Sequence, residues 1–241
     1  MQIEQRLRKA LLVRELYPDF VPFLRDALEV LGFKATWMQE DIASFMEEDG
    51  NLCVEAQRGE AKSTIACIRA VHKLVLNPAT RVLLVSGSGG KAIENAHLIY
   101  GLIMRWELLD YLRPDRGSGD RDAVGSFDVH WSLKGVDKSA SVTCLGITSS
   151  LQGFRADLLI ADDVETNRNG MTAAQRAILL TLTKEFSSIV ADSAGQILYL
   201  GTPQTKDSIY NTLPMRGFKV RIWPGRFPQA SDLAKYGDLL A

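Results

Sequence analysis

The chain has 241 residues, of which 46% are hydrophobic and 24% are charged, which fits one sizeable globular domain with a small appendage. Its net charge of −1 excludes a DNA-binding surface built from bulk positive charge, so any such surface must be a local patch. Three cysteines fit no metal-binding spacing and are expected to be reduced core residues of a cytosolic protein (Cys53, Cys67 and Cys144). We see no signal peptide and no apolar run long enough to cross a bilayer, so no membrane role is expected.

Two amphipathic helices are predicted over residues 3–16 and 18–31, and we expect residues 1–32 to form an N-terminal helical arm or lid. A third helix is predicted over residues 36–47, with Thr36 as its N-cap and Gln39 at the capping-box position. Gln39 has a second interpretation, because a glutamine amide can both donate and accept toward the edge of an adenine.

Residues 52–64 predict a strand, a small-residue turn and a helix that begins at Lys62 and Ser63. Such a turn aims backbone N–H groups and a helix N-terminus at an anion. The lysine can reach the outer phosphates of a nucleotide, and the serine hydroxyl can hold Mg²⁺. The pattern G-x-x-x-x-G-K-[ST] is incomplete, because Ala56 and Ala61 replace its glycines, so a solvated strand-to-helix turn is the alternative. The candidate nucleotide-binding residues of this stretch are Arg58, Gly59, Glu60, Ala61, Lys62, Ser63 and Thr64.

The next segments predict a buried strand over residues 81–86, a helix over residues 90–112 and a mobile charged loop over residues 113–125. Three arginines of that loop could touch phosphates, although a solvated loop is at least as good an interpretation (Arg113, Arg116 and Arg121). Residues 127–133 and 140–147 alternate around Gly135 and predict an antiparallel hairpin.

A second motif is the apolar run that ends in Asp162 and Asp163 and is followed by Glu165. A buried strand that ends in a carboxylate places it at the ligand crevice of an open α/β sheet. There Asp162 is expected to hold Mg²⁺ through water, opposite the Ser63 hydroxyl. Asp163 or Glu165 could polarise the attacking water, with Asp163 narrowly preferred. Solvent-facing acids at a strand end are the alternative.

A helix is predicted over residues 171–190 with Thr172 at its start, followed by a buried strand with a polar tip over residues 195–204. If this strand lies beside the Asp162 strand, Thr202 and Gln204 lie near the γ-phosphate and can sense its loss. An ordinary strand-to-turn exit is the alternative. A short helix near residues 206–213 and a last strand over residues 217–223 follow, and residues 224–241 look like a linker.

This order of elements, with one strand between the phosphate-loop strand and the acidic strand, predicts an α/β fold with a mostly parallel sheet flanked by helices. The class is a P-loop NTPase with an additional central strand, often called ASCE or RecA-like. Residues 33–223 are expected to form this ATPase domain.

The motifs also resemble those of the tailed-bacteriophage large terminases. Arg58 stands four positions before Lys62 and the first loop glycine is lost, as in the deviant Walker A motif of that family. Residues 151–163 resemble the family's approach to its Walker B motif. Thr202 falls in the position of its coupling motif, and Gln39 falls in that of an adenine-contacting glutamine. The match spans roughly residues 33–223.

The resemblance implies an ATP hydrolase that uses ATP and Mg²⁺ to move double-stranded DNA into a procapsid in the host cytoplasm. It implies a homo-oligomeric ring on a portal protein, with a small terminase subunit as partner, although the isolated domain could be monomeric. Lys62 would contact the β- and γ-phosphates, and Ser63 and Asp162 would serve Mg²⁺. Arg58 would act in cis on the γ-phosphate, and Arg155 is a looser candidate for an arginine finger or a subunit contact.

The sequence departs from the family pattern where Asp163 stands in place of a glutamate, which leaves the catalytic carboxylate open. The family's nuclease domain would follow residue 223, so residues 224–241 are expected to lead toward it and no DNA cleavage is expected from this chain. Two other functions fit the motifs: a helicase-like nucleic-acid translocase and a nucleotide-binding module without motor activity.

Overall fold

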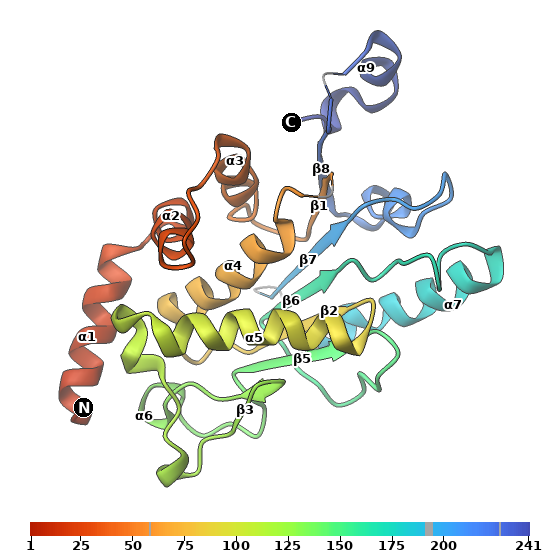
Figure 1. The fold of residues 1–241 in the computed structure, drawn as a ribbon. Coiled ribbons are helices and arrows are strands. Elements are labelled where there is room, and N and C mark those ends of the chain that lie inside the picture. The colour runs from red at the N-terminus through yellow and green to blue at the C-terminus, as the bar shows by residue number, and fades with distance from the viewer. Residues whose placement is uncertain (58, 191–194, 227) are drawn as a thin grey trace.

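The computed structural model describes residues 1–57, 59–190, 195–226 and 228–241. Their centre is an eight-stranded sheet in the order β3-β4-β5-β2-β6-β7-β1-β8, with helices on both faces (Figure 1). The six strands from β5 to β8 in that order run parallel, and the pairings of β3 with β4 and of β4 with β5 are antiparallel. The strands are β1 (Leu52–Ala56), β2 (Val82–Ser86), β3 (Asp122–Ala123), β4 (Ser126–Phe127), β5 (Val142–Gly146), β6 (Leu158–Asp162), β7 (Gln196–Gly201) and β8 (Lys219–Trp223).

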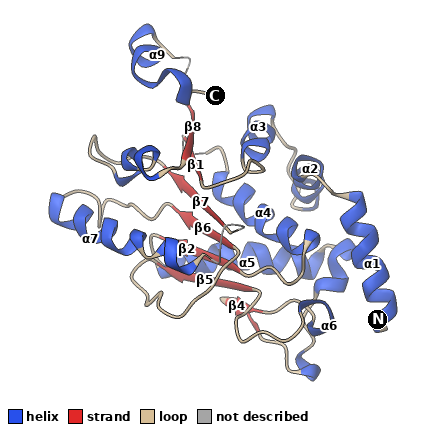
Figure 2. Ribbon diagram, turned by 180° about the vertical axis from the view of Figure 1, so that it is seen from behind, coloured by secondary structure: helices blue, strands red, loops and turns tan. Residues whose placement is uncertain are grey.

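Most of the helices form two layers, one on each face of the sheet, whereas α9 lies beyond the β8 edge (Figure 2). The core on one face includes side chains of α4 and α5 together with those of the N-terminal helices, and the core on the other face includes α7 and α8. The helices are α1 (Ile3–Leu16), α2 (Phe20–Val30), α3 (Trp37–Phe45), α4 (Lys62–Leu76), α5 (Gly89–Arg105), α6 (Trp131–Lys134), α7 (Ala173–Lys184), α8 (Phe186–Ile189) and α9 (Ala230–Tyr236). None of the helices in the described ranges is long and apolar enough to span a membrane.

The central strands are buried on both faces, which is why they read as continuous apolar runs. In β2, Leu83 packs into the α7 side and Leu84 into the α4 side, because successive side chains of a strand point to opposite faces. The three cysteines are buried and free, as the sequence predicts. The predicted α/β class with a mostly parallel sheet is confirmed.

The N-terminal helices pack onto the core through a buried histidine of α4. His72 Nε2 lies 3.0 Å from the carbonyl oxygen of Tyr17, and His72 Nδ1 lies 2.9 Å from a guanidinium nitrogen of Arg69. Because a carbonyl can only accept and a guanidinium can only donate, this histidine is neutral with its proton on Nε2. Burial lowers the pKa of His72 to about 4, which fits that state. The two predicted helices are confirmed, whereas the domain division at residues 32 and 223 and the arm or lid role stay predictions.

Two predicted helices are divided in the structure. The helix predicted over residues 90–112 ends at Arg105, because Trp106 is extended with ψ of 111°, and a 3₁₀ turn (Glu107–Leu112) follows. The helix predicted over residues 171–190 is divided at Glu185 into α7 and α8. Its predicted start is correct, since the Thr172 side chain accepts from the N–H of Gln175.

The predicted hairpin of residues 127–133 with 140–147 is wrong except where β4 meets β5. Residues 131–134 form α6, and β5 pairs parallel with β2 on its other side. The chain leaves the sheet after Phe127 because Asp128 turns inward as a hydrogen-bond acceptor for Arg121 and Ser141. The loop predicted to be mobile also has local structure, namely a 3₁₀ turn (Arg116–Ser118) and the β3–β4 hairpin.

The candidate nucleotide site

The phosphate loop connects β1 to α4 at the carboxyl edge of the sheet. Gly59 and Ala61 both have a positive φ, of 103° and 57°. An alanine in the left-handed region costs roughly 1–2 kcal/mol, so the loop keeps a glycine-like turn even where the glycine is replaced. The Gln57 amide donates to the Glu60 carboxylate at 2.7 Å, which ties the two ends of the loop together. Arg58 lies outside the described residues.

Lys62 begins α4 and points to the tip of β7. This residue is only 6% exposed, and its ammonium group donates to the Thr202 hydroxyl at 3.2 Å. The Thr202 hydroxyl in turn donates to the carbonyl of Ala56 at 3.2 Å, at the end of β1. Because β7 lies between β1 and β6 in the sheet, Thr202 lies between the phosphate loop and the acidic strand. The polar-tipped strand thus adjoins the Asp162 strand, which is the arrangement that the expected roles of Thr202 and Gln204 require.

Asp162 ends β6 with its carboxylate fully buried and held on both oxygens. The Ser63 hydroxyl donates to Oδ1 at 2.6 Å, and the Asn95 amide donates to Oδ2 at 2.7 Å. The sequence does not single out Asn95, whose only signal is that it is a polar residue on the buried face of α5. Thr64 follows Ser63 in the first turn of α4.

The donor set at this position fits Mg²⁺. A serine hydroxyl and a carboxylate are hard oxygen ligands, and Mg²⁺ usually takes one or two carboxylates while phosphates and water supply the rest. Among the residues that the structure describes, no group of three or more His, Cys, Asp or Glu side chains could hold a metal ion. A site that takes its remaining ligands from a nucleotide is consistent with both observations.

The two candidate catalytic carboxylates have different surroundings. Asp163 has a left-handed φ of 43° and lines a cavity of about 780 Å³ together with Thr202 and Gln204. Glu165 borders the same cavity but is only 2% exposed, and its two oxygens accept backbone N–H groups of Gln204 at 3.4 Å and Ile209 at 2.8 Å. Glu165 therefore anchors the segment that follows β7, whereas Asp163 faces the cavity at the strand end.

Gly87 makes the close approach to Asp163 possible. A Cβ atom at this glycine would lie 2.5 Å from the carbonyl oxygen of Asp163 and 2.5 Å from Thr166 Cγ2. Because the first contact is to backbone, any side chain at position 87 would displace the turn that carries Asp163.

Gln39 caps α3, as one of its two interpretations predicted. The N–H of Thr36 donates to Gln39 Oε1 at 3.0 Å, and the N–H of Gln39 donates to Thr36 Oγ1 at 3.3 Å. The capping box is therefore confirmed, and contact with adenine stays a prediction.

Arg155 lies at the other end of β6 from the site. It precedes Leu158 by three positions, and β6 from Leu158 to Asp162 alone spans about 13 Å at the usual strand rise. Its guanidinium donates to the carbonyls of Phe154 and Ser188. This position argues against contact with a γ-phosphate in the same chain, and a contact with a neighbouring subunit stays a prediction.

A strand–loop–helix unit with Lys62 and Ser63 at the helix start, and Asp162 at the end of a parallel strand one place removed, defines the P-loop NTPase fold with an additional strand. No protein-family model matches the sequence. The chain is 38% identical over 244 residues to the large terminase subunit of Enterobacteria phage T3, in a match that covers 98% of this chain and 41% of that protein. The chain is thus a relative of phage large terminases along nearly its whole length, and the resemblance inferred from its motifs is confirmed.

Two solved structures of phage large terminases match most of this chain. The crystal structure of the HK97 bacteriophage large terminase matches 85% of this chain and 42% of that chain, with 11% identity and a TM-score of 0.55. The ATPase domain of the Thermus phage P74-26 large terminase matches 84% of this chain and 76% of that chain, with 16% identity and a TM-score of 0.49. The HK97 match supports the assigned fold. The chain spans about two fifths of the length of its phage T3 relative.

Proposed function

We propose that this chain is the ATP-hydrolysing part of a viral DNA-packaging motor, which uses ATP and Mg²⁺ to move double-stranded DNA into a procapsid. The observation that carries the proposal is the meeting of Lys62, Ser63 and Asp162 at one edge of the sheet. Similarity to the T3 large terminase supports the choice of a packaging motor among P-loop ATPases.

The loop and the start of α4 bind the nucleotide phosphates in this proposal. Backbone N–H groups of residues 59–63 and the positive end of α4 face the phosphate oxygens. Lys62 leaves its hydrogen bond to Thr202 and contacts the β- and γ-phosphates. Thr202 stays bonded to the carbonyl of Ala56, so its hydroxyl oxygen becomes free to respond to the γ-phosphate or to its loss.

Ser63 and Asp162 would hold Mg²⁺, which when bound neutralises charge on the phosphate oxygens. The Ser63 hydroxyl now donates to Asp162, so it would have to turn its proton away from the carboxylate in order to serve as a ligand. Asn95 keeps the other carboxylate oxygen in place during this change.

Asp163 is the preferred acceptor of the proton of the attacking water, because its carboxylate borders the cavity beside Thr202 and Gln204. Glu165 holds the segment that carries Gln204. Arg58 is proposed to act in cis on the γ-phosphate, and Gln39 to contact adenine through its side-chain amide.

The proposed partners are double-stranded DNA, a portal protein, a small terminase subunit and further copies of this chain in a ring in the host cytoplasm. The kinship with the T3 large terminase supports these partners in general.

The proposal is tested by ATP turnover over a range of protein concentrations, with and without double-stranded DNA. A motor whose site is completed by a neighbour gives turnover per chain that rises with concentration and increases when DNA is added. The Thr202→Val variant, which keeps shape and loses the hydroxyl, should bind ATP but lose the stimulation by DNA. Turnover that is independent of both DNA and concentration would overturn the motor assignment.

A further inference from the structure

A second polar cavity lies at the amino ends of β2, β5 and β6, the edge of the sheet opposite the phosphate loop. Its volume is about 370 Å³, and Val82, Thr143 and Arg155 are among the residues that line it. No proposed step of ATP hydrolysis uses this cavity. Its distinguishing feature is its chemistry, because Arg121, Lys138 and Arg155 all contribute to its walls.

The positive charge of this cavity is only partly balanced. Within the described part of the chain, Lys138 and Arg155 form no ion pair, and the Arg155 guanidinium donates to two backbone carbonyls. Arg121 is 3.5 Å from Asp128, and that carboxylate also pairs with Lys134. Carbonyl partners fix a guanidinium in place without neutralising it, so a local positive surplus persists on a chain of net charge −1.

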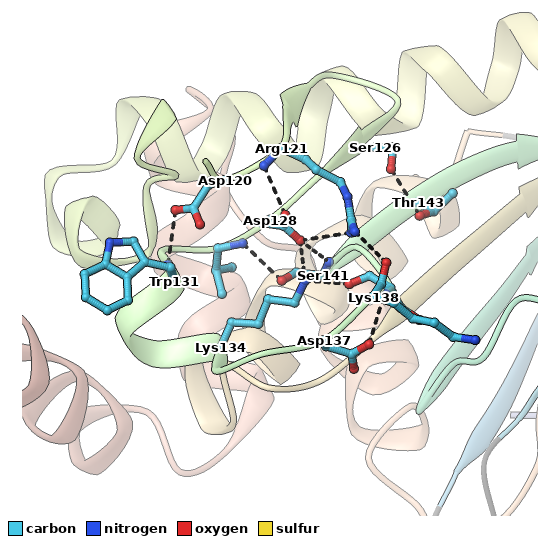
Figure 3. A network of polar contacts seen from close by, with 12 residues as sticks. Asp120, Arg121, Ser126, Asp128, Trp131, Lys134, Asp137, Lys138, Ser141 and Thr143 are labelled. Atoms are coloured by element: carbon cyan, nitrogen blue, oxygen red, sulfur yellow. Dashed lines mark hydrogen bonds and ion pairs between the residues drawn. The ribbon is translucent and has the colours of Figure 1, made fainter. Parts of the chain in front are cut away.

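Asp128 organises this side of the cavity (Figure 3). Its carboxylate is nearly buried and accepts the backbone N–H groups of Arg121 at 3.0 Å and Ser141 at 3.2 Å, together with the Lys134 ammonium group. The Arg121 side chain then donates to the carbonyl of Lys138. The Asp128 carboxylate therefore holds the backbone at Arg121 and the backbone at Ser141 together. The Arg121 guanidinium is thus positioned before any ligand arrives.

Two hydroxyl groups complete the set of donors. Ser126 Oγ and Thr143 Oγ1 lie 3.4 Å apart on neighbouring strands, and since only one of the two donates in this contact, the other hydroxyl keeps its proton for a ligand. Guanidinium forks, an ammonium group and hydroxyls together match the oxygens of a phosphate group better than those of any neutral ligand. These are also the groups that proteins use to contact the backbone of nucleic acids.

We propose that this cavity binds a backbone phosphate of double-stranded DNA, at a site separate from the nucleotide site. The inference rests on the proposed function for the source of the phosphate. Because the chain is nearly neutral overall, a DNA-contacting surface has to be a local positive patch, and this cavity is such a patch. Arg116 is not part of this surface, because it pairs with Asp122 and does not line the cavity.

The test is the binding of a labelled DNA duplex to the unmodified chain and to the double variant Lys138→Gln/Arg155→Gln over a series of salt concentrations. The matched control is Arg14→Gln/Lys34→Gln, which removes the same charge from exposed positions of the N-terminal region. We expect the cavity variant to lose roughly tenfold in affinity for the duplex. The plot of log binding constant against log salt concentration should become shallower, its negative slope decreasing in magnitude by about 2, and both effects should be equal for two unrelated DNA sequences. The control should change far less, and both variants should bind ATP as the unmodified chain does.

The outcomes separate this inference from the proposed function. If the unmodified chain binds the duplex and the cavity variant binds it with equal affinity and slope, or loses no more than the control does, the cavity is not a DNA site and the motor proposal stands. If the unmodified chain fails to bind any duplex at low salt, both fail together. Inorganic phosphate, titrated alone, identifies a free-anion site: stabilisation against unfolding that only the cavity variant loses, with DNA binding unaffected, would overturn the assignment to DNA.

Discussion

Asn95 reaches from α5 to Asp162 at the end of β6 and donates its side-chain N–H to Oδ2 at 2.7 Å. The same amide group lies 3.2 Å from the hydroxyl oxygen of Ser86. The Ser63 hydroxyl donates to the other oxygen of Asp162. The carboxylate is therefore held by α4, which follows β1, and by α5, which follows β2. Asn95 is therefore a positioning residue for the proposed metal ligand.

Asn95→Ala should lower the apparent affinity for Mg²⁺ in nucleotide binding by about tenfold or more. This is the usual cost of losing a partner that orients a metal ligand. Nucleotide binding without Mg²⁺ should change little. The measurement is nucleotide affinity as a function of Mg²⁺ concentration. Ser86→Ala is the matched control, because it removes the weaker contact of Asn95 and keeps the one to Asp162. Equal Mg²⁺ dependence in Asn95→Ala and the unmodified chain would rule out the positioning role.

Ala61→Gly should stabilise the protein. Ala61 has a φ of 57°, a conformation that costs an alanine roughly 1–2 kcal/mol and a glycine almost nothing. The greater freedom of glycine in the unfolded chain offsets part of this gain, so a net increase of about 1 kcal/mol is expected in chemical unfolding. Ala66→Gly, inside α4, is the control and should lose stability. A loss at position 61 would mean that the turn is not left-handed.

Glu55 should make the protein less stable as pH rises. This residue of β1 is 8% exposed and lines a cavity that Lys206, Arg226 and Lys235 also border. Burial raises the pKa of Glu55 from an ordinary value of 4.5 to about 7. Below pH 4.5 both states hold the proton. Between pH 4.5 and 7 only the unfolded state loses it, so the folded state loses up to about 3 kcal/mol of relative stability.

Glu55→Gln should therefore gain stability over the unmodified chain as the pH rises from about 5 to about 8. The buried His72 changes stability in the opposite direction over part of this range, but it does so in both proteins, so the difference between them isolates Glu55. Urea unfolding at both pH values measures the effect. Parallel pH profiles for the two proteins would show that Glu55 ionises normally in the folded state.

Asp163 and Glu165 should respond differently to neutral substitutions. Asp163→Asn should keep fold and ATP binding and lose hydrolysis, because asparagine tolerates the left-handed backbone at this position. Glu165→Gln should lose about 1–3 kcal/mol of stability, because glutamine keeps one of the two acceptors for the amides of Gln204 and Ile209.

Single-turnover hydrolysis and chemical unfolding, measured on both variants, separate these two roles. The assignment would be reversed if Glu165→Gln abolished hydrolysis at unchanged stability while Asp163→Asn still hydrolysed ATP.

The sequence predicted those parts of the fold that depend on local pattern. The buried runs of β2 and β6, the caps at Thr36 and Thr172 and the start of α4 at Lys62 follow from residue type and spacing. The end of α5 did not, because Trp106 continues the apolar pattern while its backbone leaves the helix. The segment after Phe127 was also misread, since its alternation suggests a strand and the tertiary contacts of Asp128 decide otherwise.

The candidate site was predictable only where a motif carries it. Lys62, Ser63 and Asp162 stand in recognisable positions, and the sheet order brings them together. Asn95 lies 67 positions from Asp162, and only the pairing of β2 with β6 makes them neighbours. The anchoring role of Glu165 was equally hidden, because its partners are backbone amides 39 and 44 positions later in the chain.

The most direct test of the central claim is equilibrium binding of ATP with and without Mg²⁺ to the unmodified chain, Lys62→Ala, Asp162→Asn and Lys73→Ala. Lys73 lies in the last turn of the same helix and serves as the control. We expect tight Mg²⁺-dependent binding by the unmodified chain and the control. Lys62→Ala should lose at least about tenfold, or 1.4 kcal/mol, and Asp162→Asn should lose the dependence on Mg²⁺. Absence of ATP binding by the unmodified chain, or equal binding by all four proteins, would contradict the assignment of this edge of the sheet as a nucleotide site.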